Sequence, residues 1–187
     1  QLRIDGFVKN TPLRCYYCKR ELMSRLIKAA QQRGFNTVFE GSNADDDNDY
    51  RPGMRAVKEL GVLSPLKNAE LTKSEIRRLS KALGLSTYSK PSLACLATRI
   101  EYDEEITAQK LRMTDRAEQV LCDLGLTQVR VRMNDNSARI EVPIDEMKIV
   151  FDNAKYINDA LKKIGYDFVS LDLEGYKTGK MNININN

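Results

Sequence analysis

Apolar residues recur at helical spacing in several stretches of the chain. Between residues 16 and 33 they stand at positions 22, 26, 29 and 30, a spacing that predicts an amphipathic helix ending at Gly34. A capping box at Thr72-Lys73-Ser74-Glu75, followed by apolar residues at 76, 79 and 83, predicts a second helix up to Gly84. By the same pattern we expect helices over residues 54–60, 105–124 and 144–164.

Shorter apolar stretches predict strands. Residues 36–40 have the composition of a short buried strand, and residues 62–66 predict a strand that stops near proline. The polar loop 41–47 follows the first strand, where α/β proteins commonly bind ligands. Residues 127–133 and 137–142 alternate around a polar turn, which predicts a hairpin, and residues 168–173 predict a further strand. The second half thus predicts a small α+β domain with helices on one face of an antiparallel sheet, beginning near residue 102.

Composition narrows the classes of protein that fit. A length of 187 residues with 42% hydrophobic residues suits two small domains, and no apolar run is long enough to cross a membrane, so we expect a cytoplasmic protein with no membrane partner. The chain has no histidine, so any catalysis must use other side chains. Basic side chains outnumber acidic ones eight to two in the first 35 residues, a bias that suits phosphates or RNA.

Cysteine spacing offers a candidate metal or redox site. Cys15 and Cys18 form a C-x-x-C pair at the start of a predicted helix, which fits a redox pair, half of a zinc site or half of an iron–sulfur site. The polar sequence before the pair disfavours a thioredoxin-type site. Cys122 is expected in the core, which leaves Cys95 as the third thiolate. Three thiolates favour a 4Fe-4S cluster with one open iron, because structural zinc prefers four ligands, but zinc stays open.

Two charged clusters complete the candidate chemistry. Acidic residues gather after the first predicted strand, at Glu40, Asp45, Asp46, Asp47 and Asp49. Carboxylate oxygens suit Mg²⁺, although a solvated loop would look the same. Arg130 and Arg132 alternate with valines on a predicted strand, so both guanidinium groups project from one face and are able to clamp an anion. An ordinary polar outer face of a sheet would show the same alternation.

The motifs that carry a family resemblance run through almost the whole chain: Arg14-Cys15-Tyr16-Tyr17-Cys18-Lys19, Gly41-Ser42-Asn43-Ala44-Asp45-Asp46, Asp49-Tyr50-Arg51-Pro52-Gly53, Ala94-Cys95-Leu96-Ala97-Thr98-Arg99, Val129-Arg130-Val131-Arg132, Ala138-Arg139-Ile140-Glu141 and Leu171-Asp172-Leu173-Glu174-Gly175-Tyr176. Together they closely resemble the LarE family, ATP-dependent sulfur transferases of the PP-loop superfamily. The resemblance implies an α/β fold. Residues 1–102 would be the C-terminal part of a parallel-sheet PP-loop ATP pyrophosphatase domain (adenine nucleotide alpha hydrolase-like), and residues 103–187 a substrate-binding α+β domain.

The resemblance also implies a two-step reaction. ATP adenylylates a carboxylate of pyridinium-3,5-biscarboxylic acid mononucleotide with release of pyrophosphate, and a sulfur nucleophile then displaces AMP. The product leads to the nickel-pincer nucleotide cofactor of lactate racemase. The resemblance further implies a homo-oligomer and no nucleic-acid partner.

Residue roles follow from the matched motifs. One branch of the family sacrifices a cysteine at the position where this chain has Ala94, so the resemblance assigns the chain to the other branch. There Cys15, Cys18 and Cys95 hold a 4Fe-4S cluster that relays sulfide from an exogenous donor.

The remaining matches concern nucleotide and substrate. Arg130 and Arg132 match residues that bind the substrate phosphate, and Glu118 and Arg99 match further active-site positions. The loop residues Asn43, Asp45 and Asp46 match the segment near ATP and its Mg²⁺, with the division of roles between the two aspartates open.

One departure from the family concerns the superfamily's glycine-rich pyrophosphate loop. No two glycines of this chain are adjacent, and the resemblance places that loop upstream of Gln1, so we expect the chain alone to release little pyrophosphate from ATP. Two alternatives remain. A tRNA-thiolating PP-loop enzyme would explain the basic first 35 residues, although such enzymes usually carry additional C-x-x-C modules. A zinc-stabilised nucleic-acid-binding module without catalysis would explain the cysteines.

Overall fold

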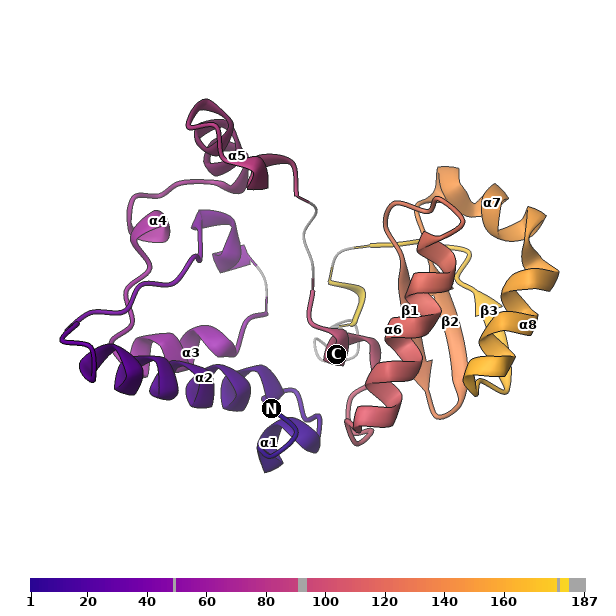
Figure 1. Cartoon of the computed structure of the whole chain (residues 1–187), viewed down its shortest axis with the longest axis horizontal. Helices are drawn as coiled ribbons and strands as arrows, with labels where there is room; N and C mark the ends of the chain where they lie inside the picture. The colour runs from indigo at the N-terminus through magenta and orange to yellow at the C-terminus, as the bar shows by residue number, and fades with distance from the viewer. Residues whose placement is uncertain (49, 91–93, 178, 182–187) are drawn as a thin grey trace. The chain divides into compact units, whose positions relative to one another are not determined.

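The computed structural model describes residues 1–48, 50–90, 94–177 and 179–181. Within them the fold is mixed α/β, mostly helical, with one three-stranded sheet (Figure 1). The chain divides into two compact units, one formed by Gln1 and Pro12–Leu93 and the other by Leu2–Thr11 and Ala94–Asn187.

The first unit is built from helices and short turns. Its helices are α2 (Arg14–Gln31), α3 (Gly53–Glu59), α4 (Pro65–Asn68) and α5 (Lys73–Ala82), with 3-10 turns at Ala44–Asn48 and Ser86–Ser89. The predicted helices over residues 16–33 and 54–60 and the predicted capping box of α5 are confirmed. Helix α2 packs on α3 around a small core of Met23, Val57 and Val62.

The sequence predicts two strands in the first unit. In the structure these segments pair only through one isolated parallel bridge, between Phe39 and Leu63. Two backbone hydrogen bonds hold it, from the Glu40 amide to the Leu63 carbonyl at 2.9 Å and from the Leu63 amide to the Val38 carbonyl at 3.0 Å. Phe39 is 65% exposed, so the prediction of a buried strand, which rested on apolar composition, is wrong. The ladder is short because Pro65 begins α4 two residues after Leu63.

The second unit contains the sheet. Its elements are α1 (Asp5–Val8), the 3-10 turn η3 (Leu96–Arg99), α6 (Ala108–Cys122), β1 (Arg130–Asn134), β2 (Ser137–Glu141), η4 (Ile144–Glu146), α7 (Met147–Asp152), α8 (Ala154–Ile164) and β3 (Phe168–Leu171). The predicted hairpin is confirmed as β1 and β2, whereas the single helix predicted over residues 144–164 is divided into η4, α7 and α8.

The prediction of an antiparallel sheet is wrong for β3. The strand order is β1-β2-β3, with β1 and β2 antiparallel and β2 and β3 parallel. Helices α7 and α8 connect the end of β2 to the start of β3 and bring the chain back to the end of the sheet where β2 begins. A helical crossover of this kind places the next strand parallel to the one before it. The sheet is therefore mixed.

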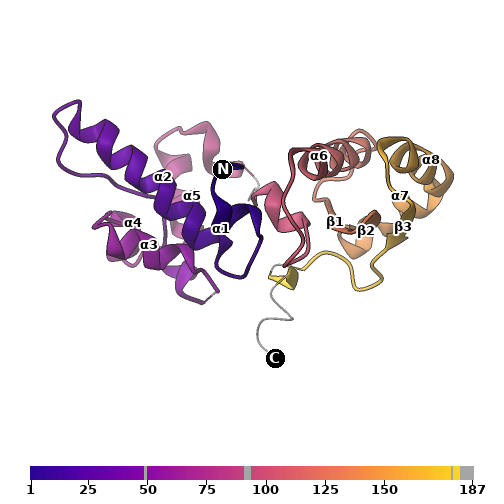
Figure 2. The ribbon, with the colours of Figure 1, turned by 90° about the horizontal axis from the view of Figure 1, so that it is seen from below.

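The hydrophobic core of this unit lies between the sheet and the helices. Figure 2 shows the three strands in one layer and α6 and α8 along one side of it. The buried core side chains are Met113, Ala117, Leu121, Leu126, Val129, Val131, Met133, Ala138, Ile140, Val142, Val150, Ile157, Leu161 and Tyr166. Because side chains alternate along a strand, the other face of the sheet carries the polar residues.

The segment with α1 is tied to the second unit by backbone contacts. The amides of Asp103 and Ile106 donate to the carbonyls of Asn10 and Val8, at 3.2 and 2.9 Å. The buried Asn10 side chain also donates to the Glu101 carbonyl at 2.6 Å. Among the helices of the described residues, none has the length and apolar character that crossing a bilayer requires.

Candidate functional site

The sheet face opposite the helices gathers charged side chains. Arg130 and Arg132 project from β1 on this face, as their alternation predicts, because the residues between them point into the core. Strand β2 adds Arg139 and Glu141, and the strand register sets Arg130 opposite Glu141 and Arg132 opposite Arg139. We call these four residues the arginine face.

Glu141 is the carboxylate at the centre of the arginine face. It is fully buried, and its two oxygens accept from Arg132 Nε at 3.1 Å each and from Arg132 Nη2 at 2.9 Å. Arg139 Nη2 lies 3.4 Å from its Oε1, and Arg132 Nη1 donates to the Thr98 carbonyl at 2.7 Å. A buried charge needs such partners, so Glu141 orients Arg132. No role for Glu141 follows from the sequence motifs, although its alternation with Arg139 on a predicted strand is a usable signal.

Arg99 and Glu118 form an ion pair at the edge of β1. Arg99 Nε donates to Glu118 Oε1 at 2.6 Å and Nη2 donates to Oε2 at 2.9 Å, a bidentate geometry. Glu118 Oε1 also accepts the Val131 amide at 3.0 Å. Helix α6 and turn η3 are thereby joined to β1, and two residues predicted as active-site positions lie in direct contact.

The electrostatic environment of Arg130 favours an anion. Burial lowers the pKa of Arg130, and the charge of Arg99 lowers it further, whereas Tyr176 and Glu118 act in the opposite direction. Arginine stays protonated despite such shifts, so Arg130 is a desolvated cation beside other cations. Arg99, Arg130 and Arg132 together face two carboxylates, Glu118 and Glu141, which leaves an excess of positive charge. A phosphate would reduce this repulsion.

Cys95 lies immediately before η3 and is joined to the same site through its backbone. Its carbonyl accepts the Thr98 hydroxyl at 2.7 Å and the Thr98 amide at 2.9 Å, and Arg99 Nη1 lies 3.4 Å from it. Arg99 Nη1 also donates to the Thr98 hydroxyl at 2.9 Å. The Cys95 side chain is exposed, so its thiol is accessible.

Cys15 and Cys18 lie in the first turns of α2, as predicted. Cys15 is exposed and Cys18 is half-buried, and a separation of three residues places both on one side of the helix. The residue between them on the buried side, Tyr16, donates its hydroxyl to Glu59 Oε2 at 2.7 Å, and Arg55 stacks 3.9 Å from its ring centroid. These contacts fix the helix start against α3 and leave Cys15 open to solvent.

The three-thiolate site predicted from the sequence takes its residues from both units. Cys15 and Cys18 belong to the first unit and Cys95 to the second, and none of the three forms a disulfide in the described residues. Over the described parts of the chain, no group of three or more cysteine or acidic side chains is arranged to hold a metal ion. Cysteine thiolates are the usual ligands of iron–sulfur clusters, so the donor chemistry fits the group, and a cluster held by these three residues stays a prediction.

The loop predicted to bind ATP and Mg²⁺ is ordered by its own side chains. Asp46 Oδ2 accepts the Asn43 amide at 3.0 Å, and Asp46 Oδ1 pairs with Arg51 at 2.8 Å. Asp45 Oδ2 accepts the Lys73 amide at 2.7 Å, so this aspartate stabilises the start of α5. The two aspartates therefore differ in role: Asp46 is buried and holds the loop together, and Asp45 is exposed and caps a helix.

Glu40 is a third ordered carboxylate in this unit, and the sequence assigned it no role beyond its charge. It accepts from the Ser64 hydroxyl at 2.6 Å, the Ser42 amide at 3.1 Å and Lys19 Nζ at 3.1 Å. Burial raises the pKa of Glu40, but these hydrogen bonds outweigh it and lower the pKa from 4.5 to about 2. Two other members of the acidic cluster, the side chain of Asp47 and residue Asp49, lie outside the described residues.

The prediction that Cys122 is a core thiol is wrong. The buried positions of α6 include Met113, Ala117 and Leu121, and Cys122 follows Leu121 by one residue, about 100° further around the helix. Its side chain is exposed. Partial burial and the charge of Glu118 raise the pKa of Cys122, which keeps the thiol protonated.

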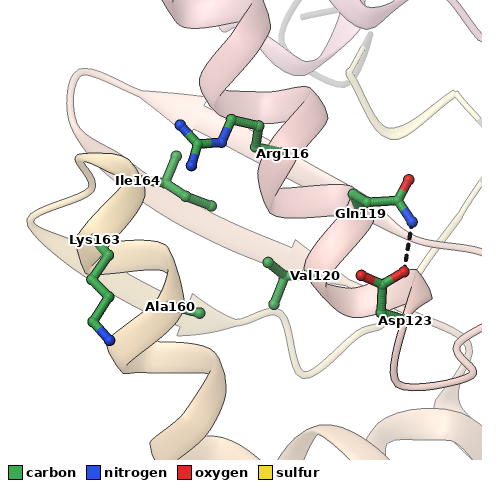
Figure 3. Close-up of a pocket in the computed structure, with 7 residues that line it drawn as sticks. All are labelled: Arg116, Gln119, Val120, Asp123, Ala160, Lys163 and Ile164. Atoms are coloured by element: carbon green, nitrogen blue, oxygen red, sulfur yellow. Dashed lines mark hydrogen bonds between the residues drawn. The ribbon is translucent and has the colours of Figure 1, made fainter.

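A shallow groove of about 370 Å³ lies between α6 and α8 (Figure 3). It is lined by Arg116, Gln119, Val120, Asp123, Ala160, Lys163 and Ile164. Its floor is apolar, and Gln119 donates to Asp123 at 2.6 Å on one side of it. None of its lining residues was predicted as a site residue. It lies between the helices that pack on the core side of the sheet, whereas strand alternation puts the arginine face on the opposite side.

Comparison with known proteins gives three relatives, and no family model matches the chain. An uncharacterized Synechocystis protein, slr1717, is 43% identical over 179 residues, which cover 95% of this chain and 67% of that protein. Pyridinium-3,5-bisthiocarboxylic acid mononucleotide synthase of Lactiplantibacillus plantarum is 36% identical over 180 residues, covering 95% and 64%. An uncharacterized Methanocaldococcus jannaschii protein, MJ0830, is 32% identical over 177 residues, covering 95% and 69%. The chain thus spans about two thirds of the length of these relatives.

Proposed function

This chain belongs to the LarE-related family of the Synechocystis, Lactiplantibacillus and Methanocaldococcus proteins, and on that premise we propose that it serves in ATP-dependent sulfur transfer to a pyridinium mononucleotide. The proposed substrate is pyridinium-3,5-biscarboxylic acid mononucleotide, which becomes a thiocarboxylate on the way to the nickel-pincer nucleotide cofactor.

In the proposed chemistry, the carboxylate is first activated, because a free carboxylate reacts poorly with nucleophiles. A carboxylate oxygen attacks the α-phosphorus of ATP, and pyrophosphate leaves. A sulfur nucleophile then attacks the carbonyl carbon of the acyl-adenylate, the carbon–oxygen bond to AMP breaks, and AMP leaves with the electron pair. The chain must therefore hold an anionic substrate still and keep a sulfur source close to its carbonyl carbon.

The observation that supports this proposal best is the arginine face. A mononucleotide carries a phosphate, and Arg130 and Arg132 project from one face of a rigid strand, where Glu141 orients Arg132. The Arg99–Glu118 pair closes the edge of the same strand. In the proposed roles, Arg130 and Arg132 bind the phosphate. Arg99 and Glu118 shape the site beside it.

We assign nucleotide activation to the first unit as part of a PP-loop domain. Asn43, Asp45 and Asp46 form the ordered loop proposed to lie near ATP and Mg²⁺. Because Asp45 is exposed and Asp46 is buried, Asp45 is the better placed of the two to meet a hydrated cation.

Sulfur delivery is assigned to the cysteines. Cys15, Cys18 and Cys95 would hold a 4Fe-4S cluster, which supplies an open iron able to carry a sulfide. Cys95 connects this role to the substrate site, because its carbonyl is hydrogen-bonded to Thr98, whose own carbonyl accepts from Arg132.

Calorimetric titration tests the phosphate assignment. The probe is nicotinic acid mononucleotide, which carries a pyridinium ring, a carboxylate, a ribose and a phosphate. Arg132→Ala should weaken binding at least tenfold, because a charge-assisted bidentate contact is lost. Arg116→Ala, which removes a cation from the α6–α8 groove, is the matched control and should bind as the wild type does. Equal losses in both variants would contradict the proposal.

A further inference from the structure

The segment after β3 crosses the polar side of the sheet. Figure 2 shows it in yellow, on the side opposite α6 and α8. We call residues 172–177 and 179–181 the strap. Lys180 closes it, because its Nζ lies 2.7 Å from Asp172 Oδ2 and 3.1 Å from Glu174 Oε2 and donates to the Gly175 carbonyl at 3.2 Å. Arg139 Nε lies 3.5 Å from Asp172 Oδ2, which links the strap to the arginine face.

The strap is held against the sheet at Gly175. This residue has a φ of +71°, and a Cβ built on it would lie 2.9 Å from the Val142 carbonyl oxygen. Only glycine fits both the conformation and the close approach. The next amide, that of Tyr176, donates to the same carbonyl at 2.9 Å. The close approach of Gly175 and the hydrogen bond of the Tyr176 amide together fix the position of the Tyr176 backbone against the sheet.

The Tyr176 ring lies against the guanidinium of Arg130, with 5.1 Å from Arg130 Cζ to the ring centroid. Tyr176 is half-buried, so part of its ring surface is open to a ligand, whereas Arg130 is almost fully buried. An aromatic surface therefore stands directly beside the residues proposed to bind phosphate. The face of an aromatic ring attracts cations, and a flat cationic ring gains both stacking and charge attraction there.

We propose that Tyr176 determines specificity for the base of the mononucleotide, by contacting the pyridinium ring while Arg130 and Arg132 hold the phosphate. This inference rests on the proposed function and deepens it. A mononucleotide carries its cationic ring and its phosphate on one ribose, and the arginine face and Tyr176 offer an anion site and a π surface side by side. A neutral base at the same place would gain stacking but no charge attraction, so the ring distinguishes a pyridinium from other bases.

The test compares two ligands and three proteins by calorimetry. The ligands are nicotinic acid mononucleotide and ribose 5-phosphate, which lacks the ring. The proteins are the full chain, Tyr176→Phe and Tyr176→Leu, each checked for an unchanged thermal unfolding midpoint. Tyr176→Leu should bind the mononucleotide about tenfold more weakly and ribose 5-phosphate as the wild type does, while Tyr176→Phe should keep both affinities.

Other outcomes overturn the inference. If Tyr176→Leu weakens both ligands equally, the ring acts only by supporting Arg130. If it tightens both, the ring shields the arginine. If it changes neither, the ring makes no contact with the base. Failure of the proposed function has a separate signature, because the wild type would then bind no ribose 5-phosphate, or would bind it equally well after Arg132→Ala.

Discussion

Arg99 and Glu118 share two short hydrogen bonds, and the same carboxylate also accepts the backbone amide of Val131. The Arg99 side chain is 3% exposed and that of Glu118 is 16% exposed, so neither charge has much access to water. The Glu118 side chain thus neutralises the buried Arg99 guanidinium and also accepts a backbone hydrogen bond from strand β1.

Replacing Glu118 with alanine should therefore destabilise the second unit. The change leaves the buried Arg99 guanidinium without its carboxylate, a loss on the order of 3 kcal/mol in the free energy of unfolding. Urea unfolding measures it. The exposed Lys155–Asp159 pair on α8 gives the control, since Asp159→Asn should leave the midpoint unchanged. A Glu118→Ala protein as stable as the wild type would show that the pair is not a structural element.

Gly175 should tolerate no side chain. Gly175→Ala combines a left-handed φ with a Cβ 2.9 Å from a carbonyl oxygen, so we expect it to cost at least about 2 kcal/mol of stability. Gly125→Ala is the matched control in the same unit, because Gly125 also has a positive φ, +89°, but no atom within 4 Å of its Cβ position. Thermal unfolding of both variants measures the difference, and equal losses would show that the contact with Val142 is unimportant.

Glu40 should make the free energy of unfolding of the first unit depend on pH. Its pKa is about 2 in the folded chain against 4.5 ordinarily, so its contribution is complete above pH 4.5 and is lost as the pH falls toward 2. We expect a loss of about 3 kcal/mol across that range. Glu40→Gln should flatten this part of the profile, and Ser64→Ala should narrow it, because one of three hydrogen bonds is removed. An unchanged profile in Glu40→Gln would refute the assignment.

The four cysteines should divide into three that bind iron and one that does not. After anaerobic purification, we expect iron and acid-labile sulfide in the wild type and in Cys122→Ala. Cys15→Ala, Cys18→Ala and Cys95→Ala should each lose most of both while keeping the far-ultraviolet circular dichroism spectrum. Zinc in place of iron, or full iron in Cys95→Ala, would contradict the three-thiolate proposal.

Local patterns were enough to predict several features of the chain. The α2 helix, the capping box of α5, the β1–β2 hairpin and the shared face of Arg130 and Arg132 all depend on residues within a few positions of one another. Helical spacing, capping and strand alternation are periodicities of the backbone itself, so the sequence carries them directly. The C-x-x-C pair at a helix start was predictable for the same reason.

Long-range packing decided the rest. The sequence did not reveal that Glu118 pairs with Arg99, 19 residues away, or that Glu141 is fully buried between two arginines. It predicted the wrong direction for β3 and the wrong side of α6 for Cys122. Each of these depends on which surfaces meet after the chain has folded. The sequence by itself thus determined the helices, the hairpin and the types of chemical group, because these are local. Only the tertiary structure determined which charges share a site, because the partners of a buried charge come from distant parts of the chain.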